Sequence, residues 1–284
     1  MSRDALTYGS LFSGIGLLDL GVEMAARDAG VSLGCAFQVE LDPFCRDVLA
    51  KHWPKVPQHE DVTRVGSTGH AVPPVDLLVG GFPCTDVSLA GKGAGLHGGT
   101  RSGLWFEFLR LITELRPRGV LVENVPGLLR RGLVDVLSGL VAAGYAVEGT
   151  RIRAEDVGAP HRRERLFLVA YADGGRQQGV GRGGLLDGER PALRHDAHGR
   201  GGEDPQSDGA AQPGLGRDAA RRPCWLDEAR WPAPPGPQLD YEPPRTQANV
   251  DDRRARLKAL GNSVVPACAY VAARRLLDRL EAAR

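Results

Sequence analysis

Short apolar runs alternate with amphipathic segments along residues 5–172 of this 284-residue chain. The apolar runs, each long enough for one buried strand, fall at residues 6–12, 33–40, 75–81, 119–124 and 164–172. The segments that carry apolar or small residues at helical spacing are 17–30, 43–53, 103–117 and 132–144. Strands that alternate with helices favour a mostly parallel sheet with helices on both faces, so the sequence predicts an α/β fold.

The composition changes sharply at about residue 173. The following stretch is rich in Gly, Arg, Asp and Pro and shows little periodicity, which is typical of an irregular insert, whether disordered or loosely ordered. Helical spacing returns near the C-terminus, and the apolar residues from Val264 onward predict a terminal helix docked on the core. We therefore expect a main domain at 1–172, a variable Gly/Arg/Pro-rich insert at 173–255, and a C-terminal segment at 256–284 that returns to the main domain.

The overall charge does not indicate a nucleic-acid-binding protein, because the net charge is +1 and the pI is near 7.7. A surface that binds nucleic acid would have to be a local patch. All but four of the 36 basic residues are arginine, whose planar fork suits phosphates and guanine edges, although a GC-rich genome explains the same excess.

The cysteines and the apolar segments bear on where the protein works. The five cysteines are widely spaced, with neither metal-ligand spacing nor a disulfide pattern. The chain lacks the apolar core of a signal peptide and has no apolar stretch of the ~18 residues that span a membrane. We expect a reduced, soluble, cytoplasmic protein without a metal site or a membrane partner.

The first motif with chemical content is the glycine-rich turn "LFSGIG", which follows the first predicted strand. Such a turn lets the backbone approach a ligand at the carboxyl end of the sheet. Glu40 ends the second strand, where such folds hold ribose hydroxyls with a carboxylate, and Asp61 is expected to end a third strand nearby. Each acid alone is also explained as a helix cap or a solvated surface group.

The second motif is "GGFPCTDVSLAGK", which places Cys84 directly after a predicted strand and Pro83. A thiolate at that position would face the ligand crevice as a nucleophile, whereas most free cysteines are buried and inert. Six glycines in the stretch 85–103 that follows suggest a lid.

Two further motifs supply a carboxylic acid and two positively charged arginines. Glu123 in "ENVPG" ends another strand and would face the same crevice, where burial would let it donate a proton to a heteroaromatic nitrogen. Arg163 and Arg165 alternate in "HRRERLF" and would project on one side of the strand's approach. A helix-capping acid and surface arginines are the alternative explanation.

Together these motifs resemble those of the DNA (cytosine-5)-methyltransferase family. "LFSGIGLLDLG" is similar to the family's cofactor-binding motif, "GGFPCTDVSLAGK" to its nucleophile motif, "ENVPG" to its acid motif and "HRRERLF" to its Q-x-R-x-R motif. "LGNSVVP" (260–266) resembles the motif that returns the end of the chain to the cofactor pocket. The resemblance implies a Rossmann-like, S-adenosylmethionine-dependent methyltransferase fold, with 1–172 as the catalytic and cofactor-binding domain and 173–255 at the target-recognition position.

The resemblance also implies a reaction. Cys84 would add to C6 of a cytosine flipped out of double-stranded DNA, Glu123 would protonate or hydrogen-bond N3, and C5 would take the methyl group. Arg165 and Arg163 would hold the O2 atom of the base and the adjacent backbone. The protein would be a monomeric DNA (cytosine-5-)-methyltransferase of a restriction-modification or phage-protection system, with a restriction endonuclease as a possible partner.

The resemblance assigns the remaining site residues. The DNA contacts are Ser88, Lys92 and Arg101. The S-adenosylmethionine contacts are Phe12, Ser13, Gly14, Gly16, Leu17, Glu40, Asp61, Val62, Pro83, Leu104, Asn262 and Val264.

The chain departs from the family pattern at two places. His161 stands where the family usually has glutamine, and the region before "LGN" carries no recognisable family motif. Recognition by a minimal segment near 225–245, relaxed specificity and a non-functional remnant therefore stay open. A tRNA cytosine-5 methyltransferase, a catalytically silent DNA-binding relative and a cysteine hydrolase that pairs His161 with Cys84 are the competing functions.

Overall fold

The computed structural model describes residues 5–83, 101–172 and 250–283. Within these ranges the strands form one seven-stranded sheet in the order β3-β2-β1-β4-β5-β7-β6. The strands are β1 (Leu6–Leu11), β2 (Leu33–Val39), β3 (Gln58–His59), β4 (Leu77–Gly80), β5 (Gly119–Asn124), β6 (Tyr145–Arg153) and β7 (Glu164–Ala172). The pairs from β3 to β5 are parallel, whereas β7 runs antiparallel to both β5 and β6.

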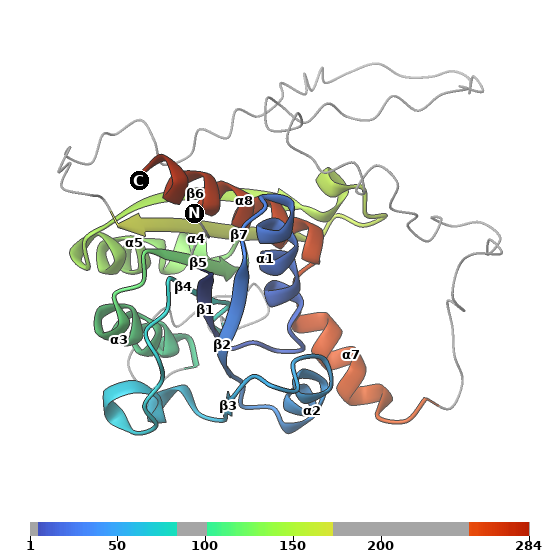
Figure 1. Ribbon diagram of the computed structural model, residues 1–284. Coiled ribbons are helices and arrows are strands. Elements are labelled where there is room, and N and C mark those ends of the chain that lie inside the picture. The colour runs from blue at the N-terminus through green and yellow to red at the C-terminus, as the bar shows by residue number, and fades with distance from the viewer. Residues whose placement is uncertain (1–4, 84–100, 173–249, 284) are drawn as a thin grey trace, which may run out of the picture.

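Helices cover both faces of the sheet (Figure 1). The α-helices are α1 (Leu17–Asp28), α2 (Pro43–His52), α3 (Trp105–Leu115), α4 (Leu128–Arg131), α5 (Leu133–Ala142), α7 (Arg253–Asn262) and α8 (Pro266–Ala282). The short 3₁₀ helices are η1 (Val62–Arg64), η2 (Gly66–Thr68), η3 (Arg101–Leu104) and η4 (Ala154–Val157). The prediction of a mostly parallel α/β sheet with helices on both faces is confirmed, and the fold is Rossmann-like.

Alternate side chains of each central strand enter opposite cores. In β4, Leu77 and Val79 pack with α1 and α8, whereas Leu78 packs with α3. This alternation follows from the two-residue period of a strand, and each fully buried large side chain stabilises the fold by roughly 1.5–3 kcal/mol. A near-continuous apolar strand is therefore what a sheet covered on both faces requires.

The predicted helices and strands lie where the sequence placed them, to within a few residues at each end. Helix α1 ends at Asp28 and is followed by Gly30 in the left-handed region, and Pro43 is the first residue of α2. The predicted C-terminal helix is α8, and a separate helix, α7, precedes it.

Strand β6 is the one long element of the described sheet that the sequence did not predict. Its outer position leaves most of its side chains half-buried, so it lacks the continuous apolar run of a central strand. None of the helices in the ranges that the structure describes is long and apolar enough to cross a membrane.

Candidate active site

Most of the candidate site residues lie along one edge of the sheet. Strands β1, β2, β4 and β5 are parallel, so their carboxyl ends meet at this edge. The turn 12–16 follows β1, Glu40 follows β2, and residues 81–83 follow β4. Glu123 is the penultimate residue of β5. This edge is where open α/β sheets bind their ligands.

The turn after β1 has an unusual backbone. Phe12, Gly14 and Gly16 have φ values of 54°, 56° and 79°, in the left-handed region. That region costs a non-glycine residue such as Phe12 about 1 to 3 kcal/mol, and such residues cluster at functional sites. A β-carbon built on Gly14 meets no atom within 4 Å, so this side of the turn is open to a ligand.

Hydrogen bonds fix the turn to the end of β2. The Gly14 N–H donates to Oε2 of Glu40 at 2.7 Å, and the Ser13 N–H donates to the Val39 carbonyl at 3.1 Å. Oε1 of Glu40 accepts from the Asp42 N–H at 2.8 Å. Both carboxylate oxygens of Glu40 are thus held beside the open face of the turn.

A buried polar group lies beneath this turn, and sequence reasoning missed it. Asp19 in the first turn of α1 is fully buried and accepts from Ser10 Oγ at 3.0 Å and Gln38 Nε2 at 3.1 Å. Ser13 Oγ donates in turn to Ser10 Oγ at 2.9 Å. Burial raises the pKa of Asp19 to about 6, and the bonds from Gln38 and Ser10 oppose that rise. The sequence signal was Asp19 itself, an acid at the dinucleotide-motif position where a third glycine would stand.

The segment that follows β3 contains two more of the expected cofactor contacts, Asp61 and Val62. The expectation that Asp61 ends a third strand is wrong in detail, because β3 ends at His59 and Asp61 instead caps η1. The Asp61 carboxylate accepts from the backbone N–H and the hydroxyl of Thr63 at 2.9 and 2.8 Å. The cap follows from residue type, since an aspartate one position before a helical turn satisfies its free N–H groups. Val62, the next residue, is buried.

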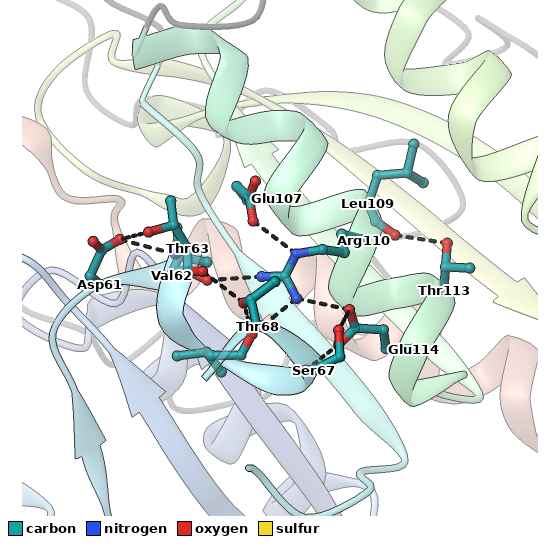
Figure 2. A network of polar contacts seen from close by, with 11 residues as sticks. Asp61, Val62, Thr63, Ser67, Thr68, Glu107, Leu109, Arg110, Thr113 and Glu114 are labelled. Atoms are coloured by element: carbon teal, nitrogen blue, oxygen red, sulfur yellow. Dashed lines mark hydrogen bonds and ion pairs between the residues drawn. The ribbon is translucent and has the colours of Figure 1, made fainter. Parts of the chain in front are cut away.

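Arg110 of α3 holds the η1 segment in place (Figure 2). Its guanidinium donates to the carbonyls of Val62 and Val65 at 3.0 and 2.9 Å. Glu107 and Glu114 each lie 2.9 Å from the same guanidinium. Since a charged, half-buried guanidinium forms strong hydrogen bonds to such acceptors, this network fixes the backbone of η1.

The acid and one of the arginines come together as predicted. Glu123 Oε1 lies 2.8 Å from Nε of Arg165, and the two side chains are 13% and 14% exposed. Burial raises the pKa of Glu123 to about 7, and the positive charges of Arg165 and Arg163 oppose the rise. Gly81 leaves room for the carboxylate, because a β-carbon there would lie 2.5 Å from Oε2 of Glu123.

Asn124 ties the acid motif to the loop after β4, a contact that the sequence did not predict. Its side-chain N–H donates to the Phe82 carbonyl at 3.2 Å, and its side-chain oxygen accepts from the Val125 N–H at 2.8 Å. Asn124 is buried, and Pro83 follows Phe82 directly. The bond therefore fixes the point at which the chain leaves the sheet toward Cys84.

Arg163 contacts the C-terminal segment. Its guanidinium donates to the carbonyls of Gly261 and Ser263 at 2.6 and 2.5 Å. Asn262 lies between those two residues and is exposed, whereas Val264 is buried against α1 and α8. Arg163 thus ties the start of β7 to the end of α7 and the residue that follows it.

The other expected contacts are distributed as follows. Leu17 and Leu104 are half-buried and pack against the two cores, and Phe12 packs beside Phe108 with 6.3 Å between ring centroids. Cys84, Ser88 and Lys92 lie outside the described residues, and so do the insert 173–249 and the side chain of Arg101. Among the residues that are described, no three His, Cys, Asp or Glu side chains form a group that would hold a metal ion.

The chain matches known proteins over somewhat more than half of its length. It is 35% identical over 175 residues to the Type II methyltransferase M.NlaIV of Neisseria lactamica, which covers 58% of this chain and 41% of that protein. It is 37% identical over 172 residues to the Type II methyltransferase M2.BsuMI of Bacillus subtilis, with 57% of this chain and 41% of that protein covered. The match thus spans about two fifths of the length of these relatives.

A solved structure has the same fold. The DNMT2 structure from Spodoptera frugiperda aligns with a TM-score of 0.50 at 16% identity, covering 64% of this chain and 54% of that one. The family model described as C-5 cytosine-specific DNA methylase matches residues 6–184, well over half of the chain. The chain therefore belongs to the C-5 cytosine-specific DNA methylase family.

Proposed function

We propose that this protein transfers a methyl group from S-adenosylmethionine to C5 of cytosine in double-stranded DNA. The observation that carries the proposal is the largely buried Glu123–Arg165 pair, at the same sheet edge as the strained turn 12–16. An acid poised to protonate and a cation beside it are what cytosine activation requires. Family membership supports the same reaction.

The residues around the turn fit an adenosyl cofactor. The open side of Gly14 leaves space for a ligand next to the backbone, and the Glu40 carboxylate stands beside it. Phe12 supplies an aromatic ring, and Asp61 and Val62 supply a polar cap next to a buried apolar residue. Leu17, Pro83, Leu104, Asn262 and Val264 complete the proposed contacts. When bound, the cofactor supplies the methyl group.

The chain's own groups would activate the base. The Cys84 thiolate adds to C6 of the cytosine while Glu123 gives a proton or a hydrogen bond to N3, which makes C5 nucleophilic. Arg165 holds the base and balances the charge that develops on it, with Arg163 beside it. After C5 is methylated, it loses its proton, and expulsion of Cys84 restores the ring. Since C5 and C6 are inaccessible in a duplex, the base must be flipped out.

The remaining parts of the proposal concern DNA recognition and context. Ser88, Lys92 and Arg101 would contact DNA, and residues 173–255 would occupy the target-recognition position between the catalytic domain at 1–172 and the returning segment at 256–284. The Type II methyltransferases among the relatives support a DNA-modification role. Our proposal also includes a cytoplasmic location, a monomeric state and a cognate restriction endonuclease as partner.

Substitution of the proposed nucleophile tests the function. Purified protein with labelled S-adenosylmethionine should label C5 of cytosine in duplex DNA, and Cys84→Ser should lower the rate at least ~1000-fold because a hydroxyl is far less nucleophilic than a thiolate. Cys35→Ser, which changes a half-buried cysteine of β2, is the matched control and should keep its activity. Full transfer by Cys84→Ser would contradict the mechanism, and label appearing in tRNA alone would contradict the substrate. Bisulfite sequencing of DNA from expressing cells would then give the target sequence.

A further inference from the structure

The short helix η1 carries two of the proposed cofactor contacts and is too short to hold its own shape. Asp61 is its N-cap, and Val62 is the first of its three residues. The first turn of any helix fixes several backbone angles in return for a single hydrogen bond, so an isolated turn is unstable. The conformation of η1 therefore depends on groups outside it, and side chains bind both of its ends.

At the start of η1, the cap uses only one oxygen of the Asp61 carboxylate. Oδ1 accepts from both the backbone N–H and the hydroxyl of Thr63. In the ranges that the structure describes, Oδ2 of Asp61 accepts no hydrogen bond, and the residue is half-buried. The cap thus fixes the orientation of the Asp61 side chain and leaves one of its acceptors available.

At the other end of η1, Arg110 reaches across from α3 (Figure 2). Its Nη2 donates to the Val62 carbonyl at 3.0 Å, and its Nη1 donates to the Val65 carbonyl at 2.9 Å. Hydrogen bonds from a charged donor are stronger than those between neutral groups. The first of these carbonyls belongs to Val62 itself, so Arg110 holds a peptide group that adjoins the proposed cofactor contacts.

Two carboxylates of α3 hold the guanidinium from its own helix. Glu107 Oε2 lies 2.9 Å from Nε of Arg110, and Glu114 Oε1 lies 2.9 Å from Nη1. Glu114 also accepts from the Ser67 N–H at 3.0 Å, which binds η2 to the same helix. Because every nitrogen of the Arg110 guanidinium has a partner within the protein, this arginine acts on the backbone beside it rather than on a ligand.

We infer that Arg110 is a positioning residue for the methyl donor, and that it sets the affinity for S-adenosylmethionine by holding Asp61 and Val62 in place. This inference rests on the proposed function, which assigns those two residues to the cofactor. A segment that is ordered before the ligand arrives binds more tightly, because less entropy is lost on binding. The Glu123–Arg165 pair lies on β5 and β7, so the loss of Arg110 should act on donor binding and leave that pair in place.

Hydrogen exchange and donor binding, both without DNA, test this inference. Arg110→Met keeps a long apolar side chain and removes the donors, so the amides of residues 61–68 should exchange about tenfold faster, while those of β5 keep the wild-type rate. Kd for S-adenosylmethionine, measured by isothermal titration calorimetry, should rise about tenfold because two bonds from a charged donor are lost.

The conservative variant Arg110→Lys should recover only part of the affinity. An ammonium group keeps the positive charge but lacks the planar fork that reaches two carbonyls at once. This variant carries the test by itself if Arg110→Met does not fold, because a lysine can still pair with Glu107 or Glu114.

Arg118→Met is the matched control. Arg118 precedes β5 and lies 3.7 Å from Asp76, which precedes β4, so this ion pair stands at the amino ends of the two strands, opposite the edge that carries the site. The substitution removes the same charge and leaves η1 untouched. Both the exchange of residues 61–68 and Kd should stay within about twofold of the wild type.

Steady-state kinetics with DNA separates positioning from a general loss of structure. In Arg110→Met, KM for S-adenosylmethionine should rise about tenfold, whereas KM for duplex DNA should stay within about twofold. An equal rise in both KM values would show that the substitution damages the whole domain, and it would overturn the inference.

The remaining outcomes separate this inference from the function on which it rests. Faster exchange of residues 61–68 with an unchanged Kd would mean that the shape of η1 does not matter to the donor, and unchanged exchange would mean that Arg110 does not hold η1. Either result would overturn the inference alone. A wild type that does not bind S-adenosylmethionine would overturn the proposed cofactor and this inference together.

Discussion

Glu123 illustrates how one residue acquires its chemistry from opposing forces. Burial favours its neutral form, whereas Arg165 at 2.8 Å and Arg163 favour the anion, and the balance brings the pKa to about 7. An exposed glutamate would be fully ionised at neutral pH, and a buried one without arginines would be fully protonated. A pKa near the working pH lets a carboxyl group both hold a proton and give it up.

The pH profile should report this group. The rate of methyl transfer should fall as pH rises through about 7, because Glu123 then loses the proton that N3 needs. Glu123→Gln should lower the rate by ~100-fold or more and remove this alkaline limb. Steady-state rates from pH 6 to 9 with saturating substrates measure both effects.

The neighbouring acid provides the control for that profile. Glu164 of β7 lies 3.5 Å from Arg151, outside the Glu123–Arg165 pair, so Glu164→Gln should keep the alkaline limb. An alkaline limb that persists in Glu123→Gln would assign that limb to another group.

Protonation of Glu123 also makes the stability of the protein depend on pH. The native state keeps the Glu123 proton up to about pH 7, whereas the unfolded chain releases it near pH 4.5. The stabilisation that this group contributes is therefore fully present below pH 4.5 and is lost as pH rises through 7.

At the scale of elements, the close packing of α1 on α8 positions the turn 12–16. Gly21 lies at their contact, where a β-carbon would come within 2.5 Å of the Ala269 β-carbon and 2.6 Å of the Pro266 carbonyl oxygen. Backbone and a short side chain cannot move aside as a long side chain can. The absence of a side chain at Gly21 is therefore what lets the C-terminal helix lie directly on α1.

Gly21→Ala should lower the free energy of unfolding by about 1 to 2 kcal/mol, because overpacking outweighs the ~1 kcal/mol that alanine gains in a helix. Urea denaturation followed by circular dichroism measures the change. Gly34→Ala in β2 is the control, since a β-carbon there meets nothing within 4 Å, and its stability should stay within ~0.5 kcal/mol. A fully stable Gly21→Ala would mean that α8 shifts freely on α1.

Across the whole molecule, the two ends of the chain build one core. Residues of α1, near the start, and of α8, near the end, share a hydrophobic cluster on the same face of the sheet, and Figure 1 shows the two helices side by side. The opposite face is closed by α3 and α5, which are local in sequence. One face of the sheet thus depends on a segment about 250 residues away from its first strand.

Truncation tests this dependence. Removal of residues 253–284 should abolish cooperative thermal unfolding, because it exposes the face of the central strands that α8 buries. Removal of residues 283–284 alone, beyond the last residue of α8, should leave the transition unchanged. Differential scanning calorimetry of both variants measures whether unfolding is cooperative. A cooperative transition in the variant that lacks residues 253–284 would show that α8 is dispensable for folding.

Local sequence determined the strands and helices that carry strong periodicity, and placed their ends to within a few residues. Apolar runs between turn signals placed β1, β4, β5 and β7, and glycine and proline marked helix ends because few other residues adopt the backbone needed there. The motifs placed Glu40 and Glu123 at strand ends, which puts both at one edge of a parallel sheet. These features depend on residues close together in the chain.

Tertiary structure alone decided the features that depend on distant partners. The antiparallel direction of β7 and the edge strand β6 follow from pairing, which an apolar run does not specify. The contacts of Arg163 with Gly261 and Ser263 join residues about 100 positions apart. The pKa of Glu123 and the neutral partners of Asp19 depend on burial and on which charges stand nearby, and neither property belongs to a residue until the chain has folded.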